Sequence, residues 1–212
     1  IEQKGRIHPM SGARPLFVVF EGIDGSGKTT ICEEVHGHYA RAGLPVVRLR
    51  EPSDGAWGKR IRDMLRSGAM PGPGEQLRLF MLDREDDVTA NVRPALEAGK
   101  IVLMDRYYHS NAAYQGALGL DPREVIAENV RKGFPEPDRV YLVDLDPSEA
   151  LRRVRGRNGD TGDVFENEEF LSAVRRAYLS VADRGFLVLD GRLAVRDIVE
   201  TVVRDIDSLL GE

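Results

Sequence analysis

The sequence holds a single cysteine, Cys32, and no apolar run long enough to cross a bilayer. One cysteine cannot form an internal disulfide, and a spanning helix needs about 20 consecutive apolar residues. Basic charge is not in excess, because 30 Lys and Arg residues stand against 35 Asp and Glu residues, for a formal net charge of −5. These absences argue against a disulfide scaffold, a membrane protein and a globally basic nucleic-acid binder. We therefore expect a cytoplasmic protein with no membrane or nucleic-acid partner.

The chain is long enough for one large domain. Its 212 residues are 42% hydrophobic and 31% charged, as in an ordinary globular protein with a real core. The first methionine is Met10, so we expect residues 1–9 to be an expression leader and residues 1–15 to lie outside the fold. Residues 16–212 are then expected to form a single domain.

Short apolar segments, continuous rather than alternating, predict parallel strands that are buried on both faces. They cover residues 16–20, 45–49, 101–104, 140–143 and 186–189. Helical spacing covers residues 28–42, 75–98 and 168–183, and residues 68–74 have the composition of a loop. Alternating strands and helices predict an α/β fold, a five-stranded parallel sheet flanked by helices, with ligands at the carboxyl ends of the strands.

The most specific motif is a glycine-rich loop that follows the first apolar segment and opens the first helical one. It matches the phosphate-loop pattern G-x-x-x-x-G-K-[ST], in which backbone N–H groups and a helix N-terminus bind phosphate oxygens. Lys28 would add a charge at the β- and γ-phosphates, and Thr29 a hydroxyl ligand for Mg²⁺. The alternative is a glycine-rich turn without a ligand. The expected ATP-binding residues are Gly22, Ile23, Asp24, Gly25, Ser26, Gly27, Lys28, Thr29 and Thr30.

A phosphate loop alone predicts nucleotide binding and leaves the reaction open. The sequence has no Asn-Lys-x-Asp segment, which a guanine-specific switch would carry. After the segment 101–104 come Asp105 and Arg106, where a motor ATPase would place a second, catalytic carboxylate. We expect Asp105 to hold Mg²⁺ and Arg106 to grip the phosphate of a second anionic substrate with its planar guanidinium. The alternative for these two residues is an exposed ion pair at a strand end.

Together, several segments make the chain similar to thymidylate kinases over most of residues 16–211. The resemblance implies a three-layer P-loop kinase fold with a short mobile lid at about residues 152–166, and a homodimer. It also implies transfer of the γ-phosphoryl group of ATP, with Mg²⁺, to dTMP. The segments that carry it are Phe20-Glu21-Gly22 with the phosphate loop, Arg50-Glu51-Pro52, Leu79-Phe80 with Asp83-Arg84, Asp105-Arg106-Tyr107, Ser110-Asn111 and Ala113-Tyr114-Gln115.

The resemblance implies a dTMP site assembled from these segments. Phe80 would stack on thymine, and Arg84, on the same face of a helix, would donate to a base carbonyl. The alternative places Phe80 in the core and pairs Arg84 with an acid at the surface. Tyr114 would exclude a 2′-hydroxyl, and Asp24 would contact the 3′-hydroxyl. The full expected set is Asp24, Glu51, Pro52, Phe80, Arg84, Arg106, Asn111, Tyr114, Gln115 and Glu166.

Two departures from the family lie near the expected base and sugar. Ser53-Asp54-Gly55 stands where the family commonly has two glycines and a threonine, and Asp87 stands where a histidine is frequent. His109, which follows Asp105-Arg106-Tyr107 closely in the sequence, is expected at the surface without a role. Residues 191–194 are expected to border the adenine.

Arginines crowd the segment that precedes Asn158-Gly159-Asp160. By themselves Arg152, Arg153, Arg155 and Arg157 would form the solvated basic end of a helix. The phosphate loop holds no arginine, and thymidylate kinases of that kind supply one from the lid, so the resemblance implies Arg153 and Arg157 as transition-state donors. The expected catalytic residues are Lys28, Arg106, Arg153, Arg157 and Asp24, with Thr29 and Asp105 as metal ligands.

Two rival functions stay open. One is a kinase for another deoxynucleotide or for a deoxynucleoside. The other is a non-catalytic nucleotide-binding switch whose lid signals to a partner. The intact set of Lys28, Thr29, Asp105 and Arg106 argues against the switch.

Overall fold

One parallel sheet forms the centre of the molecule, with strand order β2-β3-β1-β4-β5. The computed structural model describes residues 14–158 and 167–211, and for Arg157 and Asn158 the backbone alone. The predicted strand segments are confirmed to within one residue at each end. Their bounds are β1 Leu16–Glu21, β2 Val46–Arg50, β3 Ile101–Asp105, β4 Arg139–Asp144 and β5 Phe186–Asp190.

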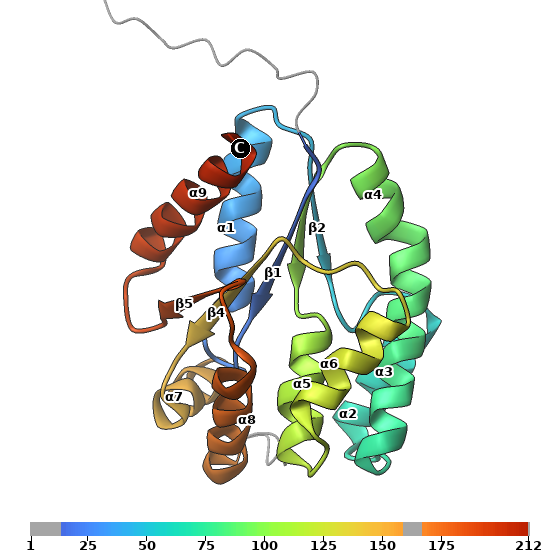
Figure 1. Cartoon of the computed structure of the whole chain (residues 1–212). Coiled ribbons are helices and arrows are strands. Elements are labelled where there is room, and N and C mark those ends of the chain that lie inside the picture. The colour runs from blue at the N-terminus through green and yellow to red at the C-terminus, as the bar shows by residue number, and fades with distance from the viewer. Residues whose placement is uncertain (1–13, 159–166, 212) are drawn as a thin grey trace, which may run out of the picture.

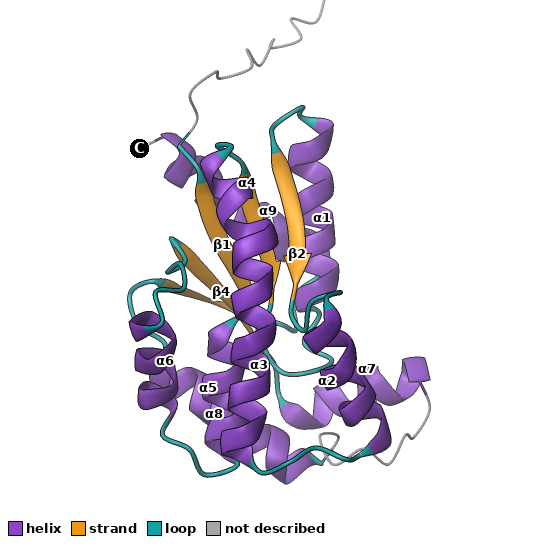
Figure 2. Ribbon diagram, turned by 90° about the vertical axis from the view of Figure 1, so that its right-hand side faces the viewer, coloured by secondary structure: helices purple, strands orange, loops and turns teal. Residues whose placement is uncertain are grey.

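Helices cover both faces of the sheet, which confirms the three-layer α/β fold (Figure 1). On one face lie α1 (Lys28–Arg41) and α9 (Val195–Gly211), whose buried apolar side chains pack on the strands. On the other lie α3 (Pro73–Asp87), α4 (Arg93–Glu97), α5 (Tyr108–Ala117) and α6 (Pro122–Arg131). Figure 2 shows α3 running along this face. Among the described residues, no helix has the length and apolar character that a bilayer span requires.

Three further helices lie toward the carboxyl ends of the strands (Figure 1). They are α2 (Ala56–Ser67), α7 (Pro147–Asn158) and α8 (Glu168–Val181). Helix α8 packs closely on α5, and the two share a buried apolar cluster with the phosphate-loop residue Ile23. The loop is therefore anchored in the core on the side where ligands bind.

The long helix predicted over residues 75–98 is interrupted. Helix α3 ends at Asp87, a π-helical turn covers Val88–Val92, and α4 begins at Arg93. Pro94 has no N–H to donate, so it removes one hydrogen bond from an α-helical ladder, and the wider turn lies directly before it. Helix α3 also starts at Pro73, inside the segment predicted as a loop, because a proline loses nothing at the first helical position. Helices α2, α5, α6, α7 and α9 lie outside the predicted helical segments.

Candidate active site

The phosphate loop connects the end of β1 to the start of α1. Gly25 and Gly27 have φ angles of +86° and +97°, a left-handed region that strains any residue with a side chain. A Cβ on Gly25 would lie 2.3 Å from the carbonyl oxygen of Ala150 on α7, so only glycine fits there. Helix α1 begins at Lys28, directly after the loop, and its first N–H groups are available to phosphate oxygens.

Lys28 is buried against the loop. Its Nζ donates to the carbonyl oxygen of Ile23 at 3.4 Å and lies 3.5 Å from Oδ1 of Asp24. Burial lowers the pKa of Lys28, the charge of Arg106 adds to this effect, and Asp24 opposes it. A further anion beside this ammonium group would therefore stabilise its charged form.

Thr29 and Asp105 meet where the loop faces the end of β3. The hydroxyl of Thr29 donates to Oδ2 of Asp105 at 2.6 Å, and the other carboxylate oxygen, Oδ1, is buried without a hydrogen bond. Such oxygen atoms suit Mg²⁺, which is bound through one or two protein ligands together with waters and substrate phosphates. The described residues form no cluster of three or more His, Cys, Asp or Glu side chains that could cage a metal. The predicted ligand pair thus fits Mg²⁺.

Arg106 follows β3 directly and has a φ of +70°, which no other non-glycine residue of the described chain approaches. A strained backbone of this kind costs about 1–3 kcal/mol and is characteristic of functional sites. Its Nη2 donates to Oδ1 of Asp24 at 2.5 Å and to the hydroxyl of Tyr114 at 3.3 Å. The Arg106 side chain is only 16% exposed, so the alternative of an exposed ion pair is wrong.

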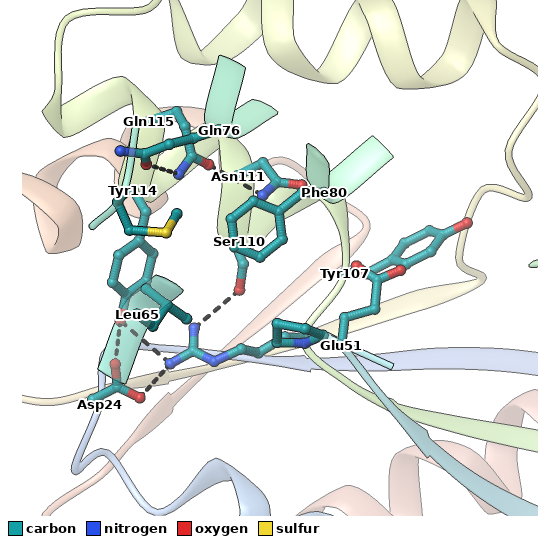
Figure 3. Close-up of a pocket in the computed structure, with 13 residues that line it drawn as sticks. Asp24, Glu51, Leu65, Gln76, Phe80, Tyr107, Ser110, Asn111, Tyr114 and Gln115 are labelled. Atoms are coloured by element: carbon teal, nitrogen blue, oxygen red, sulfur yellow. Dashed lines mark hydrogen bonds and ion pairs between the residues drawn. The ribbon is translucent and has the colours of Figure 1, made fainter. Parts of the chain in front are cut away.

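Asp24 lies among cations. Partial desolvation raises the pKa of this half-exposed carboxylate, but the charges of Arg106 and Lys28 and the hydroxyl of Tyr114 outweigh that effect and hold the pKa below its ordinary value. The Tyr114 hydroxyl donates to Oδ2 of Asp24 at 3.0 Å (Figure 3). Asp24 is therefore an anion at neutral pH and engages the same guanidinium that is expected to bind a phosphate.

A cavity of about 180 Å³ opens beside Arg106. Figure 3 shows side chains that line it, among them Phe80 and Tyr114. One water needs only about 10–15 Å³ by this measure, so the cavity can admit part of an organic ligand. Eight of its lining residues belong to the predicted dTMP set, namely Asp24, Glu51, Pro52, Phe80, Arg106, Asn111, Tyr114 and Gln115. The sequence did not predict the other five, which are Leu65, Met70, Gln76, Tyr107 and Ser110.

Arg84 does not line this cavity. Its side chain is 0% exposed and forms a buried ion pair with Glu51, in which Nε donates to Oε1 at 3.0 Å and Nη2 donates to Oε2. Nη1 donates to Asn129 at 2.7 Å, and Nη2 also donates to Asn111 at 2.8 Å. Four of the five N–H groups of Arg84 are therefore used within the protein. The contact of Arg84 with a base carbonyl stays a prediction, and the alternative of a surface pair is wrong because the pair is buried.

Three side-chain amides continue the hydrogen bonds of Arg84 along the cavity wall. Asn111 donates to Gln115 at 3.1 Å, Gln115 donates to Gln76 at 3.0 Å, and Gln76 donates to the carbonyl oxygen of Pro71 at 2.7 Å. A guanidinium can only donate, so the Asn111 oxygen faces Arg84, and this fixes the orientation of each following amide. Every amide nitrogen carries a second N–H, so this wall can offer donors to a carbonyl.

The two departures from the family contribute no residue to the lining of the cavity. The backbone N–H and the hydroxyl of Ser53 donate to Asp83 at 2.7 and 2.6 Å. Asp87 is buried and accepts a hydrogen bond from Asn91 at 2.7 Å. Neither Ser53 nor Asp87 lines the cavity, so these departures do not alter its described surface.

The prediction that His109 lies at the surface is wrong. The residue is 5% exposed, and its ring centroid lies 4.3 Å from that of Tyr108 and 5.1 Å from that of Phe186. Helix α5, which carries it, is packed between α6 and α8, so most of its side chains face protein. Burial, with a smaller effect of Arg84, lowers the pKa of His109 to about 3.

Of the predicted lid residues, Arg153 is described most fully. It donates to Oε1 of Glu149 at 3.2 Å and to the carbonyl oxygen of Gly191 at 3.0 Å. Helix α7 is thereby tied to residues 191–194, the segment expected to border adenine. The backbone of Arg157 lies at the end of α7, whereas its side chain and all of Glu166 lie outside the described residues.

Fold and site together define a class. A parallel α/β sheet carries a phosphate loop after β1, a Thr–Asp pair suited to Mg²⁺, and an arginine beside a ligand-sized cavity. These features are those of a P-loop phosphotransferase with a second, anionic substrate.

Comparison with known proteins identifies the family. The thymidylate kinase family model matches residues 20–202. A thymidylate kinase of Leptospira interrogans is 37% identical over 191 residues, which cover 90% of this chain and 93% of the relative. A probable thymidylate kinase of Archaeoglobus fulgidus is 40% identical over 195 residues (92% and 96%), and a thymidylate kinase of Desulfotalea psychrophila is 32% identical over 201 residues (95% and 98%). The chain belongs to the thymidylate kinase family. It phosphorylates dTMP to dTDP with ATP as the donor.

Proposed function

We propose that Arg106 binds the 5′-phosphate of dTMP in this reaction, while the cavity beside it receives the sugar and the base. One observation carries the proposal. The Arg106 guanidinium lies between the phosphate loop and the cavity, 2.5 Å from Asp24 of the loop, and it borders both. A phosphate bound there would lie close to Lys28 and hence to the γ-phosphate of ATP.

This placement accounts for the chemistry that the reaction needs. A nucleotide 5′-phosphate is largely dianionic near neutral pH, because its second pKa is about 6, so no general base is required. The barrier arises from bringing two anionic groups together, and fixed cations lower it. Arg106 and Lys28 would supply two of these cations. The incoming phosphate would compete with Asp24 for Nη2 of Arg106, leaving that carboxylate available to the 3′-hydroxyl.

We assign the ATP phosphates to the backbone of residues 22–30 and to Lys28. Thr29 and Asp105 would hold Mg²⁺, which neutralises charge on the β- and γ-phosphates when bound. Arg153 and Arg157 are proposed as further cations at the transition state, because residues 23–26 of the loop include no arginine. Residues 191–194 are proposed to border adenine, and Gly191 accepts a hydrogen bond from Arg153 at 3.0 Å.

The base would lie against Phe80 and the chain of amides. Phe80 lines the cavity from α3 and can stack on thymine. The second N–H groups of Asn111 and Gln115 can donate to thymine carbonyls. Tyr114 would lie against C2′ of the sugar, and Glu51, Pro52, Arg84 and Glu166 complete the proposed set.

We also propose a cytoplasmic homodimer. The buried, unpaired Cys32 supports a reducing compartment, and the resemblance to the family supports the dimer. A groove between α3 and α6 combines apolar residues such as Leu82 and Leu120 with charges of both signs, including Arg78 and Glu128. Mixed charges suit a two-fold contact in which the same surface meets itself. Sedimentation velocity should therefore show a dimer, and a monomer at micromolar concentration would contradict this part of the proposal.

The test is a coupled ADP-release assay with ATP, Mg²⁺ and a panel of nucleosides and monophosphates. Arg106→Ala should lower kcat/KM for dTMP by at least about 100-fold. Arg93→Ala is the matched control, because Arg93 is exposed and donates to the carbonyl oxygen of Gly133, away from the cavity. Wild-type kcat/KM in Arg106→Ala would refute the proposal. Turnover of thymidine would favour a nucleoside kinase, and no turnover of any acceptor would favour the switch.

A further inference from the structure

Glu21, the last residue of β1, is a buried carboxylate that the roles assigned above do not use. It is 0% exposed and lies directly before the phosphate loop. Its Oε1 accepts the backbone N–H groups of Tyr107 and Ser110 at 2.8 and 3.1 Å. Its Oε2 accepts the hydroxyls of Ser110 and Tyr178 at 2.6 and 2.8 Å. The residue thus joins β1 to α5 and to α8.

The two hydroxyls that donate to Glu21 also face Arg106. Nη1 of Arg106 donates to the Ser110 hydroxyl at 3.0 Å and to the Tyr178 hydroxyl at 3.5 Å. Each hydroxyl has one proton, and an ionised carboxylate can only accept. The two hydroxyls also lie 2.9 Å apart, where either can donate to the other. Burial raises the pKa of Glu21, and the Ser110 hydroxyl and the charge of Arg106 oppose this rise. With Glu21 ionised and accepting both protons at 2.6 and 2.8 Å, the lone pairs of both hydroxyl oxygens are left for the guanidinium. In this way the buried carboxylate sets the polarity of the contact.

Glu21 also holds the backbone turn that carries Arg106. Helix α5 begins at Tyr108 and has no capping side chain of its own at Tyr107. The two N–H groups bound by Oε1 of Glu21 lie at this helix start. The Ser110 N–H also donates to the carbonyl oxygen of Tyr107 at 3.0 Å, and the Tyr107 N–H has Glu21 as its acceptor. Arg106, with its left-handed φ of +70°, is the residue just before this turn. One carboxylate thus contacts both the turn after Arg106 and the hydroxyls beside its guanidinium.

We propose that Glu21 and Tyr178 are positioning residues, which hold the guanidinium of Arg106 in place for the acceptor's phosphate. The inference rests on the phosphate-binding role proposed for Arg106. The two terminal nitrogens of the Arg106 guanidinium then have different partners. Nη1 is held by groups of the protein interior, while Nη2 is held by Asp24, whose side chain is 53% exposed and can give way to a phosphate.

Tyr178→Phe tests the proposal because it removes one hydroxyl and keeps the ring. Tyr141→Phe is the matched control, since its hydroxyl also donates to a carboxylate, Asp205 at 2.8 Å, on a buried tyrosine that does not line the cavity. Dissociation constants are measured for dTMP and for thymidine, which has the same base and sugar but no phosphate. Tyr178→Phe should weaken dTMP about fivefold, the usual effect of one hydrogen bond, and leave thymidine unchanged. Tyr141→Phe should change neither.

Glu21→Gln tests whether residue 21 must accept the protons of the Ser110 and Tyr178 hydroxyls. Its amide has the same shape but carries N–H donors where the two hydroxyls now donate, so dTMP binding should fall by at least as much as in Tyr178→Phe. If Glu21→Gln does not fold, the comparison of Tyr178→Phe with Tyr141→Phe still tests the proposal. Equal losses for dTMP and thymidine in Tyr178→Phe, or no loss for dTMP, would overturn the inference.

Arg106→Ala, measured in parallel, distinguishes a failure of the phosphate-binding role of Arg106 from a failure of the positioning role of Glu21 and Tyr178. If it weakens dTMP but not thymidine while Tyr178→Phe changes neither, the phosphate-binding role stands and the positioning role is refuted. If Arg106→Ala weakens both ligands equally, the phosphate-binding role and the positioning role are refuted together.

Discussion

Replacing Arg84 by Gln removes one partner of an ion pair that the fold has withdrawn from water. The Arg84 and Glu51 side chains are 0% and 4% exposed, so the variant leaves a carboxylate that solvent does not reach. Breaking a buried pair in this way costs about 3–5 kcal/mol of the free energy of unfolding. The double variant Glu51→Gln/Arg84→Gln leaves no unpaired charge and should be more stable than Arg84→Gln alone. As a comparison, Arg139→Gln breaks a pair with Asp205 whose side chains are 22% and 24% exposed, and should cost only about 1 kcal/mol.

The loss in Arg84→Gln should grow with pH. Burial raises the pKa of Glu51 to about 7 from 4.5, although Arg84 opposes this rise. The folded state therefore binds the Glu51 proton more tightly than the unfolded state does. The stability that this proton contributes is complete below the pKa of Glu51 in the unfolded chain, and it is lost as pH rises through the pKa of Glu51 in the folded protein. Removing Arg84 raises the folded pKa further, so the penalty should be larger at pH 8 than at pH 6. Urea unfolding followed by circular dichroism at both pH values measures it. Equal losses in the single and double variants at both pH values would refute the reasoning.

Three further predictions concern the phosphate loop, the lid and the buried histidine. Lys28→Ala should abolish dTMP turnover while the circular dichroism spectrum stays native, and a near wild-type rate would contradict its role. Arg153→Ala and Arg157→Ala should each lower kcat more than they raise KM for dTMP; full kcat in the double variant would place the transition-state arginine elsewhere. His109→Phe should lose less stability than wild type between pH 6 and pH 4, by up to about 1.4 kcal/mol per pH unit, because unfolded histidine takes up a proton that folded His109, with a pKa of about 3, refuses. If the urea midpoint falls by the same amount between pH 6 and pH 4 in the wild type and in His109→Phe, this prediction is contradicted.

Local patterns in the sequence were sufficient for the strands, the phosphate loop and the position of Arg106 at the end of β3. The buried strands are continuous apolar runs, and Arg106 follows one of them immediately, so both features depend on neighbours in sequence. The turn at Val88–Val92 could not be predicted from spacing, because an α-helical and a π-helical path share most of the same apolar face. A closer reading of Pro94 would have indicated the interruption.

The partners of buried polar groups could not be predicted in the same way. Arg84 pairs with Glu51, 33 positions away, and Tyr178 reaches Arg106 across 72 positions. The spacing of Phe80 and Arg84 predicts a shared helical face, but not that Phe80 borders the cavity while Arg84 points into the interior. His109 was misplaced for a related reason, since α5 is packed against α6 and α8. Its polar residues Ser110, Asn111, Tyr114 and Gln115 line the cavity, so polar residues on this helix do not mark an outer surface.

The most direct test of the account compares kcat/KM for dTMP and dCMP in the wild-type enzyme. The amide wall of Asn111 and Gln115 offers N–H donors, which meet a carbonyl on thymine but an amine on cytosine. Opposed donors lose their partners, at roughly 1–3 kcal/mol for each buried group. We predict that kcat/KM for dTMP exceeds that for dCMP by at least about tenfold. Equal values for the two nucleotides would contradict the claim that this cavity recognises thymine.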